Sequence, residues 1–257
     1  MEIENIKQVQ ARLTEMADTV TGILEKHGIR YLMAYGSLLG AVRHQGFVPW
    51  DDDFDLYLFD EEYDRAMDTL RAELPDGLII HDRLTDPLYW KSWSCLRDLR
   101  TEVHCSLHED DNAFRYRGLS VDLFRLKKMP RREFGAYLDR ENIEFLVRKL
   151  DSGTMPREVY EQKLAAVVTH YAGELSAIGR GEGSDEEIYG FLIYGFHAPA
   201  DWIFPLQKYR FAGREYWGPH SADAILTQYY GDYMTLPPPE KRRPHYDSVD
   251  FLTDTER

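Results

Sequence analysis

The sequence has few cysteines, no long apolar run and no excess of basic charge, and each shortage narrows the class of protein. Only Cys95 and Cys105 are cysteines, too few for the disulfide framework of a small secreted domain. No segment approaches the roughly 20 apolar residues of a membrane-spanning helix. The start, MEIENIKQVQ, lacks the basic region and apolar core of a signal peptide. We therefore expect reduced thiols, no transmembrane segment and a cytoplasmic location.

The charge balance argues against nucleic acid as a partner. Asp and Glu number 45 against 31 Lys and Arg, which gives a formal net charge of −14. Such a body repels nucleic acid and anionic lipid. An anionic substrate would need a local basic patch or a metal ion. Seventeen tyrosines and five tryptophans are consistent either with a site for rings or sugars or with a core rich in aromatic residues.

The spacing of apolar residues predicts alternating helices and strands in the first half. Apolar positions recur every three to four residues up to Gly28, which predicts an amphipathic helix. Shorter periodic runs follow it. The expected strands cover residues 31–34, 53–59, 78–80, 90–96, 102–107 and 119–124, and the expected helices cover residues 38–42 and 61–74.

The second half is expected to be mainly helical. The predicted helices cover residues 133–150, 157–175, 186–194 and 222–230, and the proline-rich segment after Leu236 should be extended. The predicted fold class is α/β (α+β), a mixed sheet with flanking helices. We expect residues 1–130 to form the α/β core and residues 131–257 a mainly helical part that completes it, joined in one compact unit.

The segment YGSLLGAVRHQGFVPWDDDFD, residues 35–55, contains most of the candidate site residues. Gly36 and Ser37 form a turn before a short helix, where backbone N–H groups can hold a phosphate. Such a pair is common in loops, so the turn alone indicates little. The acidic residues that follow it are more informative.

Four aspartates end this segment. On a strand Asp53 and Asp55 share one face, and Asp51 lies near the strand entry beside Asp52. Crowded carboxylates repel by roughly 4 kcal/mol per close pair at an effective dielectric of about 20, and a hard divalent cation removes that cost. The alternative is a solvated acidic turn. Asp122 favours the metal site over the solvated turn. It stands in the apolar run SVDLF, and buried carboxylates are rare unless paired or metal-bound.

The order of these motifs is similar to the active-site set of the nucleotidyltransferase superfamily. GSLLGAVRHQGFVPWDDDFDL resembles the signature of the LicD family, which includes the fukutin-type ribitol-phosphate transferases. SVDLFRL, FPLQKYRFAGREYWGP and YYGDYMTLPPPEKR resemble three later motifs of the family, in the same order. The resemblance implies a nucleotidyltransferase-like fold. It is weak between about residues 131 and 202, so acceptor choice is expected to depend on that segment.

The resemblance assigns roles to the carboxylates. Asp53 and Asp55 match the metal-binding pair, Asp122 the third carboxylate, and Asp51 an acidic position before the pair. These four are the candidate catalytic residues, and Asp53, Asp55 and Asp122 are the candidate metal ligands. The implied cofactor is Mg²⁺ or Mn²⁺, as one ion or two. Asp122 or Asp51 would accept the proton of the acceptor.

The resemblance also assigns the donor-binding residues. Gly36 and Ser37 match the phosphate-facing turn, and Arg43 and His44 match the basic pair beside it. A salt bridge to the aspartates is the alternative for Arg43. The fukutin-type relatives have a zinc site, but Cys95, His104, Cys105 and His108 do not match a four-ligand spacing. The segment His104–His108 is expected to be a strand.

Family members transfer phosphocholine, ribitol phosphate or related groups from CDP-linked donors. The resemblance implies transfer of phosphocholine or a polyol phosphate from CDP-choline or a CDP-polyol to a hydroxyl of a glycan, a lipid-linked glycan or a teichoic-acid-type polymer, with release of CMP. A membrane-attached acceptor would be reached at the inner membrane face. The alternatives are a nucleotidyltransferase that attaches NMP, and an inactive sugar- or choline-binding module. Nothing in the sequence indicates how many chains assemble.

Tyr89, Trp90 and Trp93 form a candidate choline cage. Aromatic faces hold quaternary ammonium groups at roughly 0.5–2 kcal/mol per ring, and Asp86 would supply a carboxylate. Trp90 and Trp93 would face opposite ways on a strand, so one of them is expected in the core. A polyol donor would need hydrogen-bonding groups instead.

Overall fold

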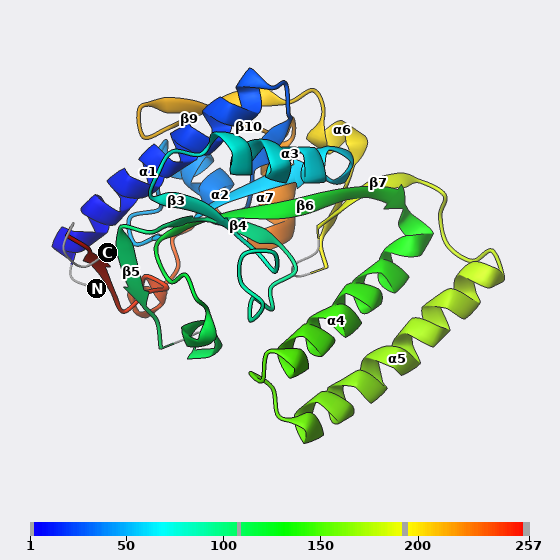
Figure 1. The fold of residues 1–257 in the computed structure, drawn as a ribbon. Coiled ribbons are helices and arrows are strands. Elements are labelled where there is room, and N and C mark those ends of the chain that lie inside the picture. Colours follow the sequence, from blue (N-terminus) through cyan, green and yellow to red (C-terminus); the bar gives the residue numbers. More distant parts are fainter. Residues whose placement is uncertain (1–2, 107–108, 192–194, 254–257) are drawn as a thin grey trace.

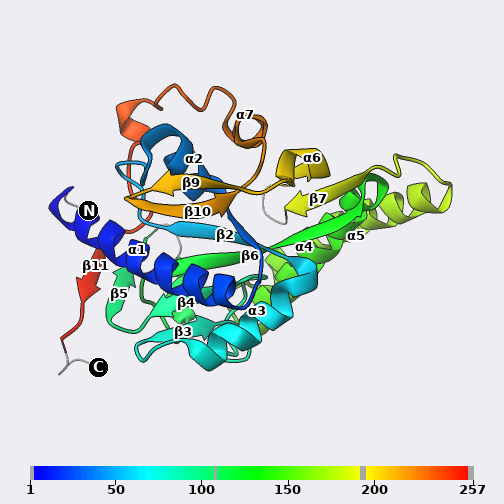
Figure 2. The same ribbon diagram turned by 90° about the horizontal axis from the view of Figure 1, so that it is seen from above.

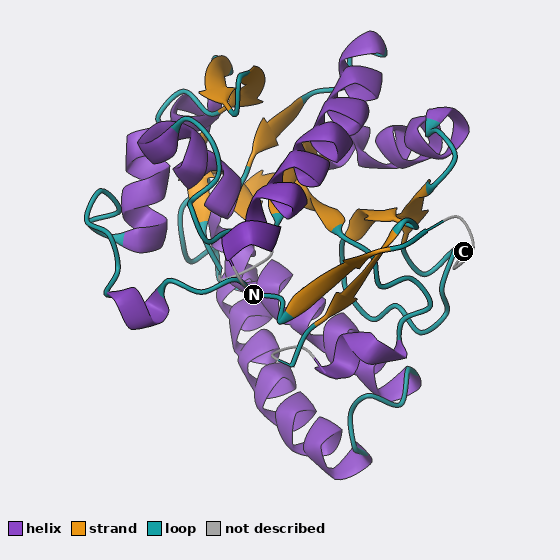
Figure 3. Cartoon of the chain, turned by 90° about the vertical axis from the view of Figure 1, so that its left-hand side faces the viewer, coloured by secondary structure: helices purple, strands orange, loops and turns teal. Residues whose placement is uncertain are grey.

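The computed structural model describes residues 3–106, 109–191 and 195–253, and its body is a mixed sheet with helices on both sides (Figures 1 and 3). The helices are α1 (Ile3–Lys26), α2 (Tyr35–His44), α3 (Asp60–Glu73), α4 (Phe134–Asp151), α5 (Arg157–Gly179), α6 (Ala200–Ile203) and α7 (Ala222–Tyr230), with 3₁₀ turns η1 (Glu109–Ala113), η2 (Arg131–Glu133) and η3 (Pro239–Lys241). The strands are β1 (Tyr31–Met33), β2 (Phe54–Phe59), β3 (Leu78–His81), β4 (Ser94–Asp98), β5 (Thr101–His104), β6 (Ser120–Pro130), β7 (Glu187–Phe191), β8 (His197–Pro199), β9 (Gln207–Phe211), β10 (Arg214–Gly218) and β11 (Ser248–Phe251). The predicted mixed α/β fold is confirmed.

The central sheet has the strand order β1-β2-β6-β4-β3, and β7 and β8 extend it beside the second half of β6. The pair β2–β6 is parallel, and the other neighbours in this sheet are antiparallel. Helices α1 and α3 cover one face, and α2 and α7 lie on the other side (Figure 2). The parallel pair sets Asp55 directly opposite Asp122.

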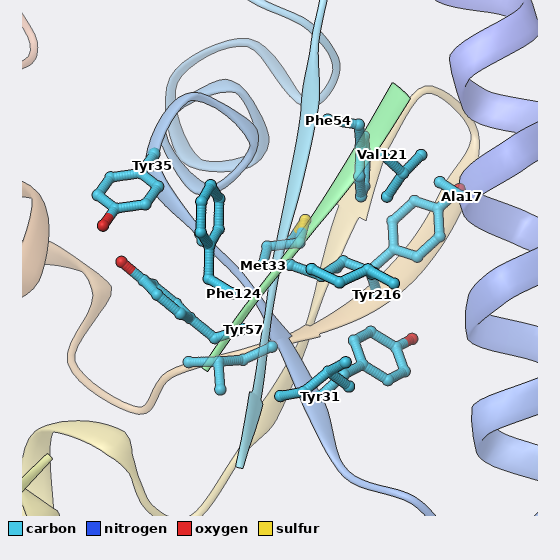
Figure 4. Close-up of a cluster of buried hydrophobic side chains, with 14 of the residues drawn as sticks. Ala17, Tyr31, Met33, Tyr35, Phe54, Tyr57, Val121, Phe124 and Tyr216 are labelled. Carbon is cyan, nitrogen blue, oxygen red and sulfur yellow. The ribbon is translucent and has the colours of Figure 1, made fainter. Parts of the chain in front are cut away.

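Strand β2 is buried on both faces, and its alternation matches the prediction. Phe54 packs with Tyr216 on the α1 side, and their ring centroids are 5.4 Å apart. On the other side Tyr57 packs against Tyr35 and Phe124 at 5.3 and 5.9 Å (Figure 4). The apolar positions anchor the strand, so the aspartates at its start are held rigidly.

The predicted helix over residues 186–194 is wrong. Residues Glu187–Phe191 form β7, paired with residues 126–130 of β6. The second half of β6 is longer than the sequence indicated, and it offers an edge of unpaired backbone groups that a strand can satisfy. Ile188 is 1% exposed in this position. Residues 192–194 of the predicted helix lie outside the described residues.

Helices α4 and α5 form a hairpin that projects from the end of β6 (Figure 1). This hairpin fits the expectation of helices after residue 130, but the C-terminal part also contributes strands β7–β11. No described helix is long and apolar enough to cross a membrane.

The chain after α7 is mostly extended, as predicted, and it returns to the sheet. It passes through η3 and ends in β11, which pairs antiparallel with β5. The strand predicted over residues 102–107 is shorter in the structure, because β5 ends at His104 and residues 107–108 lie outside the described part. The C-terminal segment is therefore tied to the side of the sheet that holds the aspartates.

Candidate active site

One face of the sheet presents three rows of side chains across β2, β6 and β4. The register pairs Asp55 with Asp122 and Asp122 with Cys95. Because side chains two residues apart on a strand share a face, the neighbouring rows follow from the same register. On one side of the Asp55–Asp122–Cys95 row lie Asp53, Ser120 and Arg97. On its other side lies a row of three aromatic residues, Tyr57, Phe124 and Trp93. The predicted carboxylates therefore meet on one face.

A cleft of about 1070 Å³ covers this face and is lined by Asp51, Asp53, Asp55 and Asp122. Burial raises the pKa of Asp53 to about 6, and repulsion from neighbouring carboxylates adds to this. Burial, followed by the charge of Asp53, also holds the pKa of Asp51 and of Asp55 well above the usual range. A cluster of this kind is typical of functional sites.

Asp122 offers a carboxylate oxygen that would suit a hard divalent cation. Asp122 Oδ2 accepts a hydrogen bond of 3.0 Å from Trp93 Nε1, whereas its Oδ1 is buried without a hydrogen-bond partner among the described residues. A buried carboxylate oxygen without a partner is costly. A cation shared with Asp53 and Asp55 would satisfy it and would offset the repulsion. The assignment of these three ligands stays a prediction.

His245 was missed in the sequence, and it lies in the middle of the acidic cluster. Its Nδ1 is 3.0 Å from Asp52 Oδ1, 3.5 Å from Asp53 Oδ2 and 4.0 Å from Asp51 Oδ1. The hydrogen bond to Asp52, together with the surrounding carboxylates, raises the pKa of His245 to about 9. Ligand atoms of Asp51, Asp53 and His245 lie within 4.8 Å of one another. The imidazolium therefore offsets part of the negative charge.

We expect the protein without divalent cations to lose stability as pH rises from 4 to 9. Asp53 binds its proton more tightly when folded (pKa about 6 against 3.8), so its contribution to stability falls between those values. His245 stabilises the fold fully below 6.5, and this contribution is lost as pH approaches 9. Thermal melts in EDTA at pH 5 and pH 8 measure the fall, and added Mn²⁺ should reduce it. Equal melting temperatures at both pH values would contradict the raised pKa values of Asp53 and His245 in the folded protein.

Gly36 and Ser37, predicted as a turn before a helix, lie in the first turn of α2 itself and contribute in two different ways. Gly36 lines the cleft, and a Cβ there would lie 2.6 Å from Asp51 Oδ2, so any larger residue would displace that carboxylate. Ser37 is buried, and its Oγ accepts a hydrogen bond of 2.8 Å from the Asp55 backbone N–H. Ser37 therefore fixes the start of β2. Donor binding by either residue remains untested.

The predicted basic pair, Arg43 and His44, ends helix α2. Arg43 lines the cleft, donates from Nη1 to the Tyr233 carbonyl (2.5 Å) and from Nε to His44 Nε2 (2.9 Å). Within the described ranges no carboxylate lies within 4.0 Å of its guanidinium, so the alternative of a direct salt bridge to the aspartates is not observed. His44 lies behind Arg43, and burial lowers its pKa.

The three candidate cage rings do not converge. Trp90 and Trp93 line the cleft, but Tyr89 is 1% exposed and packs against His81 at 4.3 Å between ring centroids. Strand β4 begins only at Ser94, so the alternation expected from residue 90 does not apply. Asp86, the carboxylate expected to complete the cage, instead accepts hydrogen bonds from His81 Nε2 and from the Arg115 backbone N–H.

Lysine ammonium groups already lie over the rings of Trp90 and Trp93 in the cleft wall. The Nζ atoms of Lys91 and Lys149 lie 5.8 and 4.3 Å from the Trp90 ring, and Lys91 Nζ lies 5.6 Å from the Trp93 ring. A quaternary ammonium group would have to share these faces with a resident cation. This geometry therefore gives little support to the predicted choline cage.

Residues 28–134 match the model described as LicD/FKTN/FKRP, nucleotidyltransferase domain, and this span contains all the predicted aspartates. Over this span, which is less than half of the chain, the protein is similar to the LicD family.

Three relatives illustrate the similarity. Lipopolysaccharide cholinephosphotransferase LicD of Haemophilus influenzae is 27% identical over 94% of this chain and 96% of its own length. Ribitol 5-phosphate transferase FKRP of Homo sapiens is 41% identical over 71 residues, which are 28% of this chain and 14% of that protein. Uncharacterized protein RP689 of Rickettsia prowazekii is 29% identical over 40% of this chain and 45% of its own length.

Proposed function

We propose that this chain transfers a substituted phosphate, either phosphocholine or a polyol phosphate, from a CDP-linked donor to a sugar hydroxyl of a glycan. The observation that supports this most directly is the parallel pair β2–β6, which sets Asp55 opposite Asp122 beside Gly36 at the start of α2. Carboxylates next to a helix N-terminus suit a metal-bound diphosphate. The two named transferases among the relatives support the same class of reaction.

In this proposal Asp53, Asp55 and Asp122 hold Mg²⁺ or Mn²⁺. A bound divalent cation neutralises charge on the transferred phosphoryl group and on the leaving phosphate. Arg43 offers a planar fork to the diphosphate, since its guanidinium faces the cleft without a carboxylate partner among the described residues. Gly36 keeps the approach open where a side chain would collide with Asp51.

Asp51 suits the role of general base better than Asp122. The acceptor oxygen attacks phosphorus, the bond to the CMP oxygen breaks, and CMP leaves with that electron pair. The hydroxyl proton must go to a nearby base. Asp122 has one oxygen bound by Trp93 and the other buried without a hydrogen-bond partner among the described residues, which the proposal assigns to the cation, whereas Asp51 is a buried carboxylate with a raised pKa.

The test is a donor screen with a purified glycan acceptor. CDP-choline, CDP-ribitol, CDP-glycerol and CDP-ethanolamine are incubated with the protein, and released CMP is measured with and without EDTA. We expect one donor to give metal-dependent CMP. Pyrophosphate release from a nucleoside triphosphate would favour the nucleotidyltransferase alternative. Tight sugar or choline binding without either product would favour a binding module.

Donor binding should weaken when Arg43 is replaced by lysine. Lysine keeps the charge but loses the bidentate fork, so we expect the Kd for the CDP-linked donor to rise about tenfold, or about 1.4 kcal/mol. Calorimetry in the absence of an acceptor, where the donor is not transferred, gives the affinity. His44→Ala is the companion variant. Unchanged affinity in both variants would mean that Arg43 has only a structural role, as the donor of the hydrogen bond to the Tyr233 carbonyl.

Replacing Trp93 by phenylalanine separates two roles of this residue. The variant keeps a ring but loses the Nε1–H that binds Asp122. If Trp93 orients the metal ligand, Mn²⁺ affinity should fall about tenfold, and CDP-choline and CDP-glycerol should suffer equally. Phosphocholine and glycerol phosphate are then compared as competitors of the wild-type protein. A choline cage requires phosphocholine to compete better, and equal competition would favour a polyol donor.

A further inference from the structure

A buried guanidinium faces the cleft and has no role in the proposal above. Arg97 on β4 is 5% exposed and lines the cleft. Its Nε donates to His81 Nδ1 (3.3 Å), and its Nη1 donates to the Gly118 carbonyl (2.8 Å). Across the described residues no carboxylate lies within 4.0 Å of it. The charge of Asp122 acts on Arg97 from beyond that distance. Buried charges are rare without a direct ionic partner, so the guanidinium is suited to pair with an anion from outside the chain.

The neighbours of Arg97 hold it in one orientation. Burial lowers the pKa of His81 to about 4, so its ring is neutral at pH 7 and its Nδ1 accepts the Arg97 Nε–H. The other ring nitrogen, Nε2, then donates to Asp86 Oδ2 at 3.0 Å. The chain Asp86–His81–Arg97 thus fixes the guanidinium through a neutral residue, which leaves its charge available in the cleft.

Arg97 lies across the carboxylates from the predicted donor site. It shares a row with Ser120 and Asp53, two strands away from Asp53, so their Cα atoms are about 10 Å apart at the usual strand spacing. Arg43 lies on α2, which packs beside β2 at the opposite end of that row. The cleft therefore has two cationic ends with the carboxylates between them.

The end at Arg97 is also shaped for a sugar. Lys91 and Arg117 line it, each paired with a carboxylate, of Asp111 and Glu102 respectively. The rings of Trp90, Trp93 and Phe114 form part of the same wall. Aromatic faces suit the apolar faces of sugar rings. A positive end is notable in a chain with a net charge of −14.

We propose that Arg97 binds an oxyanion carried by the acceptor, so that this end of the cleft is a subsite for an anionic sugar. This inference rests on the proposed function, which places the donor diphosphate at Arg43. The guanidinium fork suits a phosphate or a carboxylate equally. Neutral sugars lack the group that would pair with Arg97.

Binding measurements on the full chain test the subsite without any need for turnover. Glucose 6-phosphate, glucuronate and glucose are titrated in EDTA, with tryptophan fluorescence and calorimetry as readouts, and CDP-choline and CDP-glycerol are titrated with Mn²⁺. We expect at least one anionic sugar to bind tenfold or more tightly than glucose. The two anionic probes distinguish phosphate from carboxylate. Arg97→Gln should weaken that binding at least tenfold and change donor affinity less than twofold.

Two further variants keep the test decisive. Arg97→Lys retains the charge without the fork and should bind at an intermediate level, and it replaces Arg97→Gln if the latter does not fold. Arg115→Gln removes an exposed cation nearby and should change nothing. Loss of donor affinity in Arg97→Gln, or equal binding of glucose and both anionic sugars, would overturn the proposal. Retained Arg97-dependent sugar binding without CMP release would instead contradict the proposed reaction alone.

Discussion

Replacing Asp53 or Asp55 by asparagine is expected to reduce turnover about a thousandfold while the fold survives. Asparagine keeps the size of the side chain but removes the charge that binds a divalent cation. Both carboxylates already have a raised pKa because burial and neighbouring charges disfavour their ionised forms. In EDTA each variant should therefore melt at a higher temperature than the wild type.

The measurements are CMP release, Mn²⁺ titration and thermal melts with and without metal. Asp68→Asn is the matched control, because the Asp68 side chain lies on α3 and is 86% exposed, unlike the carboxylates of the cleft. It should leave all three readouts unchanged. Full activity in Asp53→Asn or Asp55→Asn would remove that residue from the proposed site. A lower melting temperature in EDTA would show that repulsion is not the main effect.

The local part of this site is readable from sequence because it depends on one strand. The alternation of β2 places Asp53 and Asp55 on a shared face, and its apolar positions predict which face is buried. Asp122 was identified as a polar residue in an apolar strand. Only the parallel pairing of β2 and β6 makes it the neighbour of Asp55, and strand pairing is not a local property.

The residues that were missed come from distant segments. His245 reaches the cluster by way of β11 and its pairing with β5, and in the sequence it stands only in a proline-rich segment expected to be extended. Arg97 appears as an ordinary charged residue until the cleft shows it buried without a carboxylate. Residues 187–191 look helical in isolation, yet the free edge of β6 pairs with them as β7. In each case tertiary context overrides the local pattern.

Besides the pairing of β11 with β5, the buried carboxylate of Asp52 holds the C-terminal segment over the cleft. Asp52 is fully buried, and it accepts hydrogen bonds from the His245 backbone N–H (2.9 Å), His245 Nδ1 (3.0 Å) and the Tyr246 backbone N–H (2.9 Å). Asp52 is thus the aspartate of the group that serves structure, while its neighbours face the cleft. The tail also contributes to the cleft wall through Tyr233 and Lys241.

Replacing Asp52 by asparagine should loosen this segment. The amide presents an N–H where two backbone donors expect an acceptor, which costs about 1.5–3 kcal/mol for a hydrogen bond to a charged group. The melting temperature should fall by roughly 5 °C for a chain of this size, and trypsin should cut faster after Lys241 or Arg242. Activity should fall with it, since His245 leaves the carboxylates. Asp250→Asn, on the exposed side of β11, is the control.

A double-mutant cycle with a truncation identifies the tail as the cause. Removing the chain after Gly231 should lower both stability and activity by more than Asp52→Asn does, because it leaves a buried carboxylate without its donors. In the truncated chain Asp52→Asn should then cost nothing, or even stabilise, because the asparagine no longer faces those donors. Coupling between the two changes measures their interaction. If Asp52→Asn destabilises the truncated and the full-length chains equally, Asp52 acts within the acidic cluster and does not act by docking the tail.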